Sequence, residues 1–354
     1  MPDEPIETQK RKMEHIEIIL NKDTQYRNKT TMLEYVEVVP NGRSIDPENV
    51  DTSTELLGRK ISGPLFVSGM TGGPAGTLEI NRNIAMGVSK ANIPMGLGSQ
   101  RAMLENPDLT YTYEVKKFAD IVLLGNIGAG QLLKYRNDRI QSMLDSVKAD
   151  MLAIHTNPGQ ESVQPEGDID FRGAYERICE VAKHIKQPVL LKEVGNGISK
   201  EVARRFEGKI YGIDVQGAGG TTWIGVETYR SKGSYGKAFW DWGIPTALSM
   251  LEVKSVFSGH VWASGGIRSP SDVLKSIAIG ADLCGLAKPV LVSQNKKGAA
   301  GVYELIEGMI EGLRTSMAQM GFGSIEELRK AKVRLNGPLA ELAEQREIRI
   351  KNLA

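Results

Sequence analysis

The sequence is short of cysteine and has no long apolar run. Cys179 and Cys284 are its only 2 cysteines, and neither lies in a CxxC or Cys/His spacing. This scarcity argues against a disulfide framework and a thiolate zinc site, so we expect both to be small core residues. No apolar run approaches the roughly 18 residues that span a bilayer, and the amino-terminal stretch has no apolar signal segment. We therefore expect a cytoplasmic protein with no membrane partner.

The sequence also lacks an excess of charge of either sign. The 44 Lys and Arg residues balance 43 Asp and Glu residues, which leaves a formal net charge of +1. A chain this close to neutral has neither the basic field of a nucleic-acid-binding protein nor an acidic tail, so we expect no nucleic-acid partner. With 41% hydrophobic and 25% charged residues it is globular rather than disordered. The 354 residues allow two domains or one large α/β barrel.

Glycine is abundant, and its 39 residues often fall in pairs where a strand would meet a loop. From about residue 63, short β-rich apolar runs alternate with polar or glycine-rich stretches and amphipathic helical segments. Such runs indicate parallel strands buried on both faces. The predicted strands are 64–69, 94–99, 120–125, 151–155, 188–193, 210–215, 260–265 and 282–286. Eight strand–helix units predict an α/β fold of the (β/α)8 TIM-barrel type rather than an open doubly wound sheet.

We assign the barrel to residues 63–323, with an amino-terminal extension (1–62) and a carboxy-terminal helical tail (324–354). The first extension contains a predicted helix over 11–21. The second begins with a predicted charged helix over 324–334.

Local signals place helix starts and one long loop within the barrel. Ser269-Pro270 predicts an N-cap followed by proline at the first helical position, with Asp272 as the capping-box acid. Asn106-Pro107 predicts a second helix start. The region 217–243 is rich in glycine, threonine and aromatic residues and is the candidate lid.

Active-site groups of a barrel gather where the strands end, so the residues that follow each predicted strand are candidates for chemistry. In chain order these exits read SGMTGG (68–73), GSQR (98–101), GN (125–126), HTNPGQE (155–161), KE (192–193), DVQGAGGTT (214–222), SGGIR (264–268) and GLAK (285–288). The last two favour a phosphate site, because glycines let backbone N–H groups approach phosphate oxygens. A tight turn would explain one glycine pair equally well.

Lys192 lies inside an apolar strand, where a lysine is costly without a partner. It could form a salt bridge with Glu193 or Asp214. Alternatively it is a Schiff-base lysine, or a cation beside a cofactor that becomes anionic on reduction. We favour a functional role, because strand-end lysines of a barrel face the site.

The fourth exit holds the densest polar cluster, with His155, Asn157, Gln160 and Glu161 within one predicted loop. As a set these residues favour function, and the Glu161 carboxylate suits Mg2+.

A small basic cluster lies on the predicted amino-terminal helix, at Arg11-Lys12 and His15. It is either a solvated face balanced by Glu14 and Glu17 or a clamp for a diphosphate.

Together these motifs resemble the type 2 isopentenyl-diphosphate isomerases, which are FMN-dependent (β/α)8 barrels of isoprenoid biosynthesis. The resemblance runs in order through RKxxH (11–15), MTGG (70–73), GSQR (98–101), HxNxxQE (155–161), KExG (192–195), GGTTW (219–223), SGGIR (264–268) and GLA (285–287). HxNxxQE is the most specific motif. One departure is Lys288, because the family pattern leads us to expect arginine there.

The resemblance implies that the amino-terminal extension contributes to the substrate site and that the barrel binds FMN. For FMN it implies Ser68, Gly69, Met70, Thr71, Ser99, Asn126, Lys192, Thr222, Gly265, Gly266, Ile267, Arg268, Ala287 and Lys288. For the substrate diphosphate it implies Arg11, Lys12, Ser99, Gln100, Arg101, His155, Asn157 and Gln160. It further implies Gln160 and Lys192 as catalytic residues, Glu161 on Mg2+, NADPH as flavin reductant and a homo-oligomer, either a tetramer or an octamer.

The implied reaction moves a double bond between isopentenyl and dimethylallyl diphosphate, with one proton added and one removed and no net redox change. An alkene is a poor base, so the site needs a strong, dry and well-placed acid. Gln160 is too weak an acid for this and is expected to assist, whereas the resemblance implies that reduced FMN supplies the acid/base role or the stabilisation.

Several other functions remain open from the residues alone. A 2-hydroxy-acid oxidase or dihydroorotate-type dehydrogenase would use a similar barrel, but His184 is predicted on a helix and His260 at the start of a strand. An inosine-monophosphate-dehydrogenase-like enzyme needs a cysteine that 217–243 lacks. A Schiff-base aldolase at Lys192 and a non-catalytic flavin- or phosphate-binding barrel are the remaining alternatives.

Overall fold

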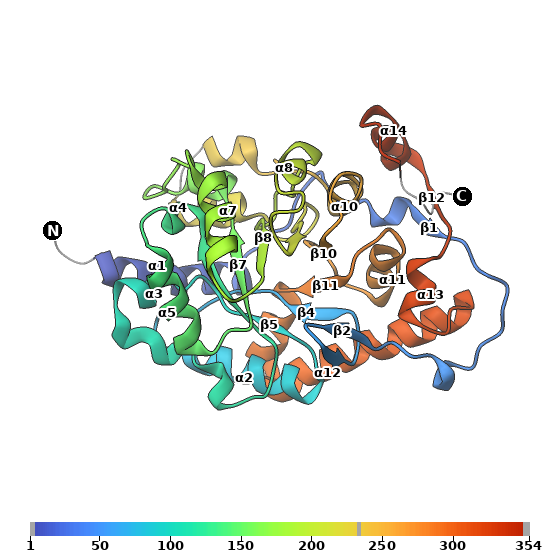
Figure 1. The fold of residues 1–354 in the computed structure, drawn as a ribbon, viewed down its shortest axis with the longest axis horizontal. Helices are drawn as coiled ribbons and strands as arrows, with labels where there is room; N and C mark the ends of the chain where they lie inside the picture. The colour runs from blue at the N-terminus through green and yellow to red at the C-terminus, as the bar shows by residue number, and fades with distance from the viewer. Residues whose placement is uncertain (1–3, 232–234, 350–354) are drawn as a thin grey trace.

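The computed structural model describes residues 4–231 and 235–349, and at its centre lies a closed barrel of eight parallel strands (Figure 1). The strands are β4 (Leu65–Val67), β5 (Met95–Gly96), β6 (Leu123–Gly128), β7 (Met151–His155), β8 (Val189–Lys192), β9 (Gly212–Asp214), β10 (His260–Ser264) and β11 (Leu283–Leu286). Each strand pairs with the next in the chain, and β11 closes on β4. The predicted (β/α)8 barrel is therefore confirmed.

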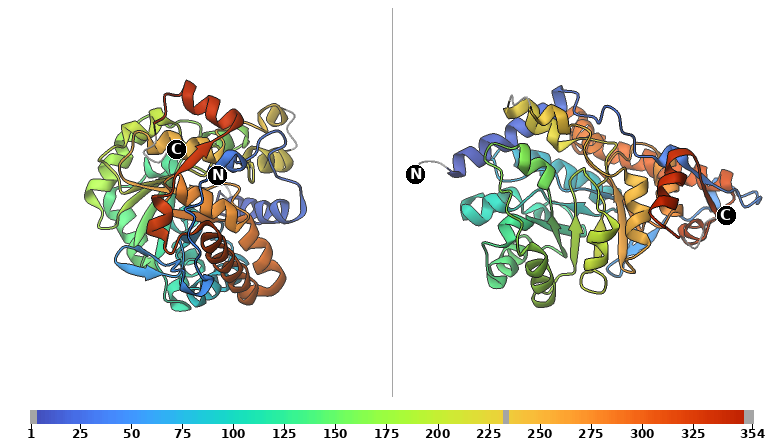
Figure 2. Two further views of the ribbon diagram at one scale, coloured as in Figure 1. Left: turned by 90° about the vertical axis from the view of Figure 1, so that its right-hand side faces the viewer. Right: turned by 90° about the horizontal axis from the view of Figure 1, so that it is seen from above.

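Helices surround the barrel on its outer side (Figures 1 and 2). They are α2 (Thr77–Lys90), α3 (Arg101–Glu105), α4 (Ala129–Leu132), α5 (Asn137–Val147), α6 (Pro158–Val163), α7 (Ala174–His184), α8 (Lys200–Arg205), α9 (Trp223–Ser231), α10 (Thr246–Lys254), α11 (Pro270–Ala278) and α12 (Lys288–Met320). The second strand–helix unit, which begins with β5, has no long helix. Its short helix α3 is followed by the 3-10 helices η3 (Pro107–Thr112) and η4 (Val115–Lys117). The capping box that Ser269 and Asp272 predict is present at the start of α11.

The barrel interior is filled at its amino-terminal end, which leaves the opposite end for a site. Inward side chains of the strands form one cluster with residues of the hairpin β2 (Thr54–Leu56) and β3 (Arg59–Ile61). The cluster consists of Leu56, Ile61, Phe66, Val122, Leu124, Met151, Leu190, Trp262 and Leu283. The Phe66 and Trp262 rings lie 4.7 Å apart between centroids. Because apolar side chains fill this end, polar groups are positioned at the carboxyl rim.

Three sequence predictions need correction in detail. Strand β6 lies three residues later than predicted, so Asn126 is within the strand rather than after it. HTNPGQE is not a loop, because Pro158 begins α6 as the first helical residue. The predicted loop 217–243 contains α9 and the 3-10 helix η5 (Tyr235–Phe239); residues 232–234 lie outside the described part.

The predicted helix 324–334 is shorter than expected. Helix α13 ends at Arg329, and Val333–Leu335 forms β12. Strand β12 pairs antiparallel with β1 (Val36–Val38), because the buried side chains of Val36, Val38 and Val333 join the core there. Helix α14 (Gly337–Gln345) follows. The two extensions are therefore linked by a small sheet of their own.

The amino-terminal helix α1 (Glu4–Asn21) lies at the end of the molecule opposite α14 (Figures 1 and 2). It packs against α3, α9 and α12, all of which follow barrel strands on the carboxyl rim. The segment that follows α1 is hydrogen-bonded to the residues that follow β9. Tyr26 N donates to Gly220 O (3.2 Å), and Thr222 N donates to Thr24 O (2.9 Å). Within the described ranges, no helix combines the length and apolar character needed to cross a membrane.

Candidate active site

Two adjoining cavities open at the carboxyl rim. The glycine-lined cavity, of about 930 Å³, lies over the exits of β4, β10 and β11. The basic cavity, of about 830 Å³, lies over the exits of β5 to β8. They share part of their lining, which consists of Lys12, His15, Gly69, Met70, Val194, Gln216 and Trp223. Groups bound in the two cavities would therefore face each other.

Glycine is required where the seventh strand leaves the barrel. Gly265 and Gly266 have φ values of 96° and 83°, in the left-handed region that favours glycine. A Cβ on Gly265 would lie 2.1 Å from the backbone oxygen of Gly217. The SGGIR exit therefore brings bare backbone against the β9 exit, which is the arrangement a phosphate cradle needs.

The same cavity is lined by cations without an ion-pair partner and by hydroxyl groups without a hydrogen-bond partner among the described residues. Arg268 and Lys288 form no ion pair with any residue in the described ranges, and burial lowers the pKa of each. Lys288 donates to Thr24 Oγ1 at 3.3 Å. Four buried hydroxyl oxygens of the lining lack a hydrogen-bond partner within the described chain: Ser68 Oγ, Thr71 Oγ1, Thr221 Oγ1 and Ser264 Oγ. This donor set fits a polar ring system carrying an anionic phosphate.

Lys192 ends β8 between its neighbours His155 on β7 and Asp214 on β9. Its ammonium donates to the backbone oxygen of Glu193 at 2.8 Å. No ion pair of Lys192 occurs among the described residues, so the direct salt bridge is not formed. Burial lowers the pKa of Lys192, and the charges of Asp214 and Glu193 oppose that shift.

The neighbouring Glu193 carboxylate is held by backbone rather than by Lys192. Its Oε2 accepts from the backbone nitrogens of Val194, Gly195 and Asn196 at 2.6, 2.8 and 2.6 Å. Burial nevertheless raises its pKa to about 7. Lys192 therefore has no directly bonded counter-ion among the described residues, and burial opposes its positive charge.

Cations and His155 define the basic cavity, whose lining includes Arg11, Lys12, Arg101 and Lys192. Asn126 Nδ2 donates to Leu97 O at 2.8 Å, so its Oδ1 faces His155 Nδ1 at 2.9 Å as the acceptor. Burial, together with Lys192 and Lys12, lowers the pKa of His155 to about 3. The ring is therefore neutral, with its proton on Nδ1.

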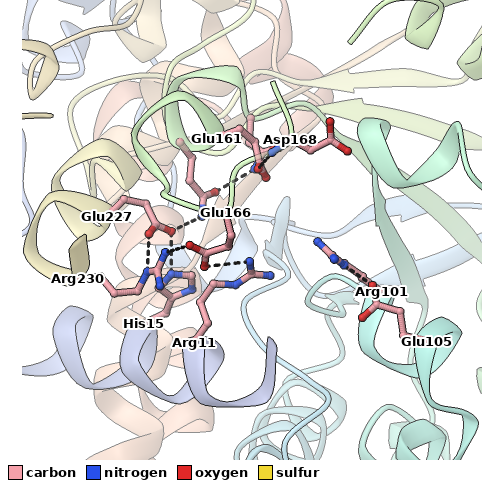
Figure 3. A network of polar contacts seen from close by, with 11 residues as sticks. Arg11, His15, Arg101, Glu105, Glu161, Glu166, Asp168, Glu227 and Arg230 are labelled. Atoms are coloured by element: carbon pink, nitrogen blue, oxygen red, sulfur yellow. Dashed lines mark hydrogen bonds and ion pairs between the residues drawn. The ribbon is translucent and has the colours of Figure 1, made fainter. Parts of the chain in front are cut away.

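The HxNxxQE motif forms one hydrogen-bonded turn. Asn157 Nδ2 donates to Glu161 Oε1 at 2.7 Å and to Gln160 Oε1 at 3.2 Å. The other oxygen of Glu161 accepts from the backbone nitrogen of Asp168 at 2.8 Å (Figure 3). The three functional side chains of this turn are therefore fixed relative to one another.

Glu227 on α9 joins this turn to α1, and the sequence analysis did not identify it. Its Oε1 accepts from His15 Nε2 at 2.8 Å and from Gln160 Nε2 at 2.9 Å, and its Oε2 accepts from Arg230 Nε at 2.7 Å (Figure 3). Burial alone would raise the pKa of Glu227, but these hydrogen bonds lower it to about 2. Glu227 is therefore a buried anion that orients Gln160.

Glu166 forms a second bridge across the cavity mouth, to Arg230 (2.7 Å) and Arg11 (3.3 Å) (Figure 3). Arg11 therefore faces the cavity. It does not lie on a solvated helix face where Glu14 and Glu17 would balance its charge. The i, i+3 spacing of Glu227 and Arg230 within an apolar stretch is the sequence feature that could have indicated these two residues. The prediction of a loop over 217–243 concealed this helical spacing.

The structure brings most predicted site residues to the two cavities. The glycine-lined cavity contains Ser68, Gly69, Met70, Thr71, Gly265, Gly266, Arg268, Ala287 and Lys288. The basic cavity contains Arg11, Lys12, Ser99, Arg101, Asn126, His155, Asn157, Gln160, Glu161 and Lys192. Apolar and amide residues that were not predicted also contribute to the linings, among them Ile16, Ile19, Gln131, Gln164, Val194, Gln216 and Leu291.

Three predicted residues line neither cavity. Gln100 is fully buried, and its Oε1 accepts from Asn126 N at 2.9 Å. Ile267 belongs to the hydrophobic core, and Thr222 is buried with its Oγ1 accepting from Gly225 N at 3.3 Å. Their positions suit them to support neighbouring loops.

A metal ion would need ligands beyond those of the protein. Across the described residues no group of three or more His, Cys, Asp and Glu side chains could hold a metal. Glu161 offers a single carboxylate at the edge of the basic cavity. Mg2+ typically binds one or two carboxylates together with substrate phosphate oxygens, so this residue fits a metal that arrives with a phosphorylated substrate.

The chain belongs to the class of the FMN-dependent dehydrogenases, whose family model it matches over more than half of its length. The profile of the family described as FMN-dependent dehydrogenase matches residues 140–335. The fold is similar to the flavin-binding domain of baker's yeast flavocytochrome b2, with a TM-score of 0.64 at 19% identity over 88% of this chain and 78% of that one. A mandelate oxidase variant gives 0.64 at 20% identity, covering 95% and 100%.

Sequence relatives specify the family further. This chain is 42% identical over 349 residues to the isopentenyl-diphosphate delta-isomerase of Methanothermobacter thermautotrophicus, covering 97% of this chain and 98% of the relative. It is 41% identical over 359 residues to the protein of the same name in Pyrococcus furiosus, covering 97% and 91%. The chain belongs to the isopentenyl-diphosphate delta-isomerase family, which confirms the resemblance carried by its motifs.

Proposed function

We propose that the protein is a cytoplasmic FMN- and Mg2+-dependent isomerase of isoprenoid biosynthesis that interconverts isopentenyl and dimethylallyl diphosphate. The observation that carries the proposal is the shared lining of the two cavities, since the cations of the basic cavity adjoin a glycine-lined recess that would suit a flavin phosphate. The family membership supports the same activity. By the same resemblance, we propose NADPH as flavin reductant and a tetrameric or octameric assembly.

The glycine-lined cavity would hold FMN. Arg268, Lys288 and the Gly265–Gly266 backbone would bind its phosphate, because they are unneutralised donors in one recess. Lys192 lines the adjoining basic cavity, so it would meet the N1–C2=O edge of a ring that extends over the shared lining and would stabilise negative charge there. Bound reduced FMN supplies the proton transfer or the charge stabilisation that the alkene needs.

The basic cavity would hold the diphosphate. Arg11, Lys12 and Arg101 supply positive charge, and the neutral His155 and Asn157 supply hydrogen bonds. Glu161 would position Mg2+ against the diphosphate oxygens. These groups fix the charged end of the substrate and leave the five-carbon end to point toward the shared lining.

The remaining residues would surround and orient the hydrocarbon end of the substrate. Met70, Val194 and Trp223 line both cavities and would exclude water from the hydrocarbon. Gln160 donates to Glu227 and accepts from Asn157, so its amide is held in one orientation. An amide is too weak an acid to protonate an alkene, and Gln160 therefore assists by orienting the reacting carbons.

Hydroxy-acid oxidation would need a histidine base late in the barrel, and neither candidate faces the rim. His184 ends α7 on the surface, and His260 begins β10 at the amino-terminal end of the barrel. Both are exposed and remote from the rim.

The test uses purified protein under anaerobic conditions. We expect a yellow protein that releases FMN on denaturation and, with dithionite or NADPH plus Mg2+, interconverts the two five-carbon diphosphates. Binding of isopentenyl diphosphate without any dimethylallyl product would contradict the proposal and indicate a binding barrel. Oxidation of a 2-hydroxy acid without isomerisation would indicate an oxidase.

A further inference from the structure

Lys12 on α1 reaches across the rim and is fully engaged by the protein. Its ammonium donates to Gly72 O, to Ser99 O at 2.9 Å and to Tyr113 Oη at 2.9 Å. An ammonium has three N–H donors, so each has an acceptor. One side chain of the amino-terminal helix therefore binds the exits of β4 and β5 and the residue that follows η3.

Of the three groups that accept a hydrogen bond from Lys12, only the Tyr113 hydroxyl belongs to a side chain. Tyr113 is fully buried. Its hydroxyl donates to Ser99 O at 2.8 Å and accepts from Lys12. Ser99 itself lines the basic cavity. The Tyr113 hydroxyl therefore links the Lys12 cation to the strand exit that forms one wall of the substrate site.

The glycines of MTGG make room for this ring. A Cβ on Gly72 would lie 2.1 Å from Tyr113 Cε1, and φ at Gly72 is +152°. A Cβ on Gly73 would lie 3.3 Å from both Lys12 Nζ and Tyr113 Oη. The motif therefore shapes a pocket for Tyr113 as well as bordering the glycine-lined cavity.

We propose that Tyr113 is a positioning residue for the diphosphate site, whose hydroxyl holds the Lys12 ammonium at the rim and keeps α1 in place before substrate arrives. The inference rests on the proposed function. No carboxylate forms an ion pair with Lys12 within the described ranges, so the neutral acceptors alone fix its position. An arriving diphosphate would then meet a cation that is already placed, without the entropic cost of ordering a lysine side chain.

Several charged or titratable groups face Lys12 from the elements around it. They are Arg11 on α1, Arg101 and Glu105 on α3, and His155 on β7. Burial, followed by Arg11, lowers the pKa of Lys12 to about 7. Diphosphate affinity should therefore fall as the pH rises through this value, and removal of the Tyr113 hydroxyl should move that fall to lower pH.

The test is a double-mutant cycle on the FMN-loaded protein with Tyr113→Phe, Lys12→Met and the double variant. The dissociation constant of inorganic diphosphate with Mg2+ is measured by calorimetry, and KM and kcat are measured with isopentenyl diphosphate. Tyr113→Phe should raise the dissociation constant and KM about tenfold, with kcat and FMN content nearly unchanged. In the Lys12→Met background the same change should add little. Tyr111→Phe is the matched control, since Tyr111 is 42% exposed.

An equal rise in both backgrounds would overturn the inference, because Tyr113 would then act independently of Lys12. A loss of FMN or kcat at unchanged diphosphate affinity would also overturn it, as would a wild-type protein that does not bind diphosphate. If the wild type binds diphosphate but does not isomerise, the proposed function fails, while the calorimetric cycle still decides the role of Tyr113.

Discussion

Glu227 is a single buried residue that joins side chains of three helices, among them the predicted site residue Gln160. Its side chain has no exposed surface, yet it remains an anion because His15, Gln160 and Arg230 donate to it. Replacing one carboxylate oxygen by an amide NH2 would set a donor against at least one of these buried donors, which is costlier than losing one ordinary hydrogen bond.

We predict that Glu227→Gln lowers kcat by about ten- to a hundredfold, because Gln160 loses the anion that orients it. The variant should also be less stable at neutral pH. A pKa lowered from 4.5 to about 2 corresponds to roughly 3 kcal/mol of folding stability, present above pH 4.5 and lost as the pH falls toward 2. Urea unfolding of both proteins across this range should show their difference shrinking with acid. A pH-independent difference would argue against a native carboxylate.

Lys192 should set the electronic properties of the flavin. In Lys192→Met we expect FMN to bind more weakly, with a reduction potential lower by roughly 30 mV or more, since the anionic reduced form loses a neighbouring cation. Anaerobic dithionite titration with a reference dye measures this potential. Normal FMN binding, an unchanged potential and full activity of the reduced variant would show that Lys192 does not have this role.

Glu161 should act only through the metal. Glu161→Gln keeps the shape of the side chain and removes the charge that would hold Mg2+, so the Mg2+ concentration for half-maximal activity should rise about tenfold or more. The measurement is a Mg2+ titration at saturating substrate. An unaltered titration curve would exclude this carboxylate as a ligand.

At the scale of elements, the strands were more predictable than the segments around them. All eight buried strands follow from apolar runs, because burial on both faces leaves a direct mark in the sequence. Helix α9 was missed because Gly225 and the glycines before it suggested a loop, whereas packing against α1 and α6 overrides this local preference. Strand β12 was missed because its partner β1 lies almost 300 residues earlier.

Arg346, which follows the carboxy-terminal helix α14, forms ion pairs with two glutamates. Arg346 contacts Glu252 at 2.9 Å and Glu201 at 2.7 Å, and the Glu252 side chain is only 4% exposed. We expect Arg346→Met to cost about 1–2 kcal/mol of unfolding free energy, because it leaves a buried carboxylate unpaired. Urea unfolding measures this, with Arg136→Met as the control at a side chain that is 91% exposed. Equal urea midpoints for the two variants would show that the ion pairs of Arg346 contribute nothing to the free energy of unfolding.

At the scale of the whole molecule, the site depends on residues from most of the chain. Helix α1 supplies Arg11, Lys12 and His15, and the last barrel unit supplies Lys288. The motifs identified most of the cavity lining because each strand exit carries its polar residues in sequence. They did not reveal Glu227, Glu166 or Tyr113, whose importance comes from partners more than 60 residues away that no local spacing records.

The most direct test of the central claim is a titration of the oxidised FMN-loaded protein with isopentenyl diphosphate and Mg2+, followed by the flavin absorbance spectrum. If the two cavities hold flavin and diphosphate side by side, the spectrum should change saturably, and Arg101→Gln should shift the midpoint to higher substrate concentration. Stoichiometric binding by calorimetry with an unchanged flavin spectrum would contradict the account, because substrate and cofactor would then lie apart.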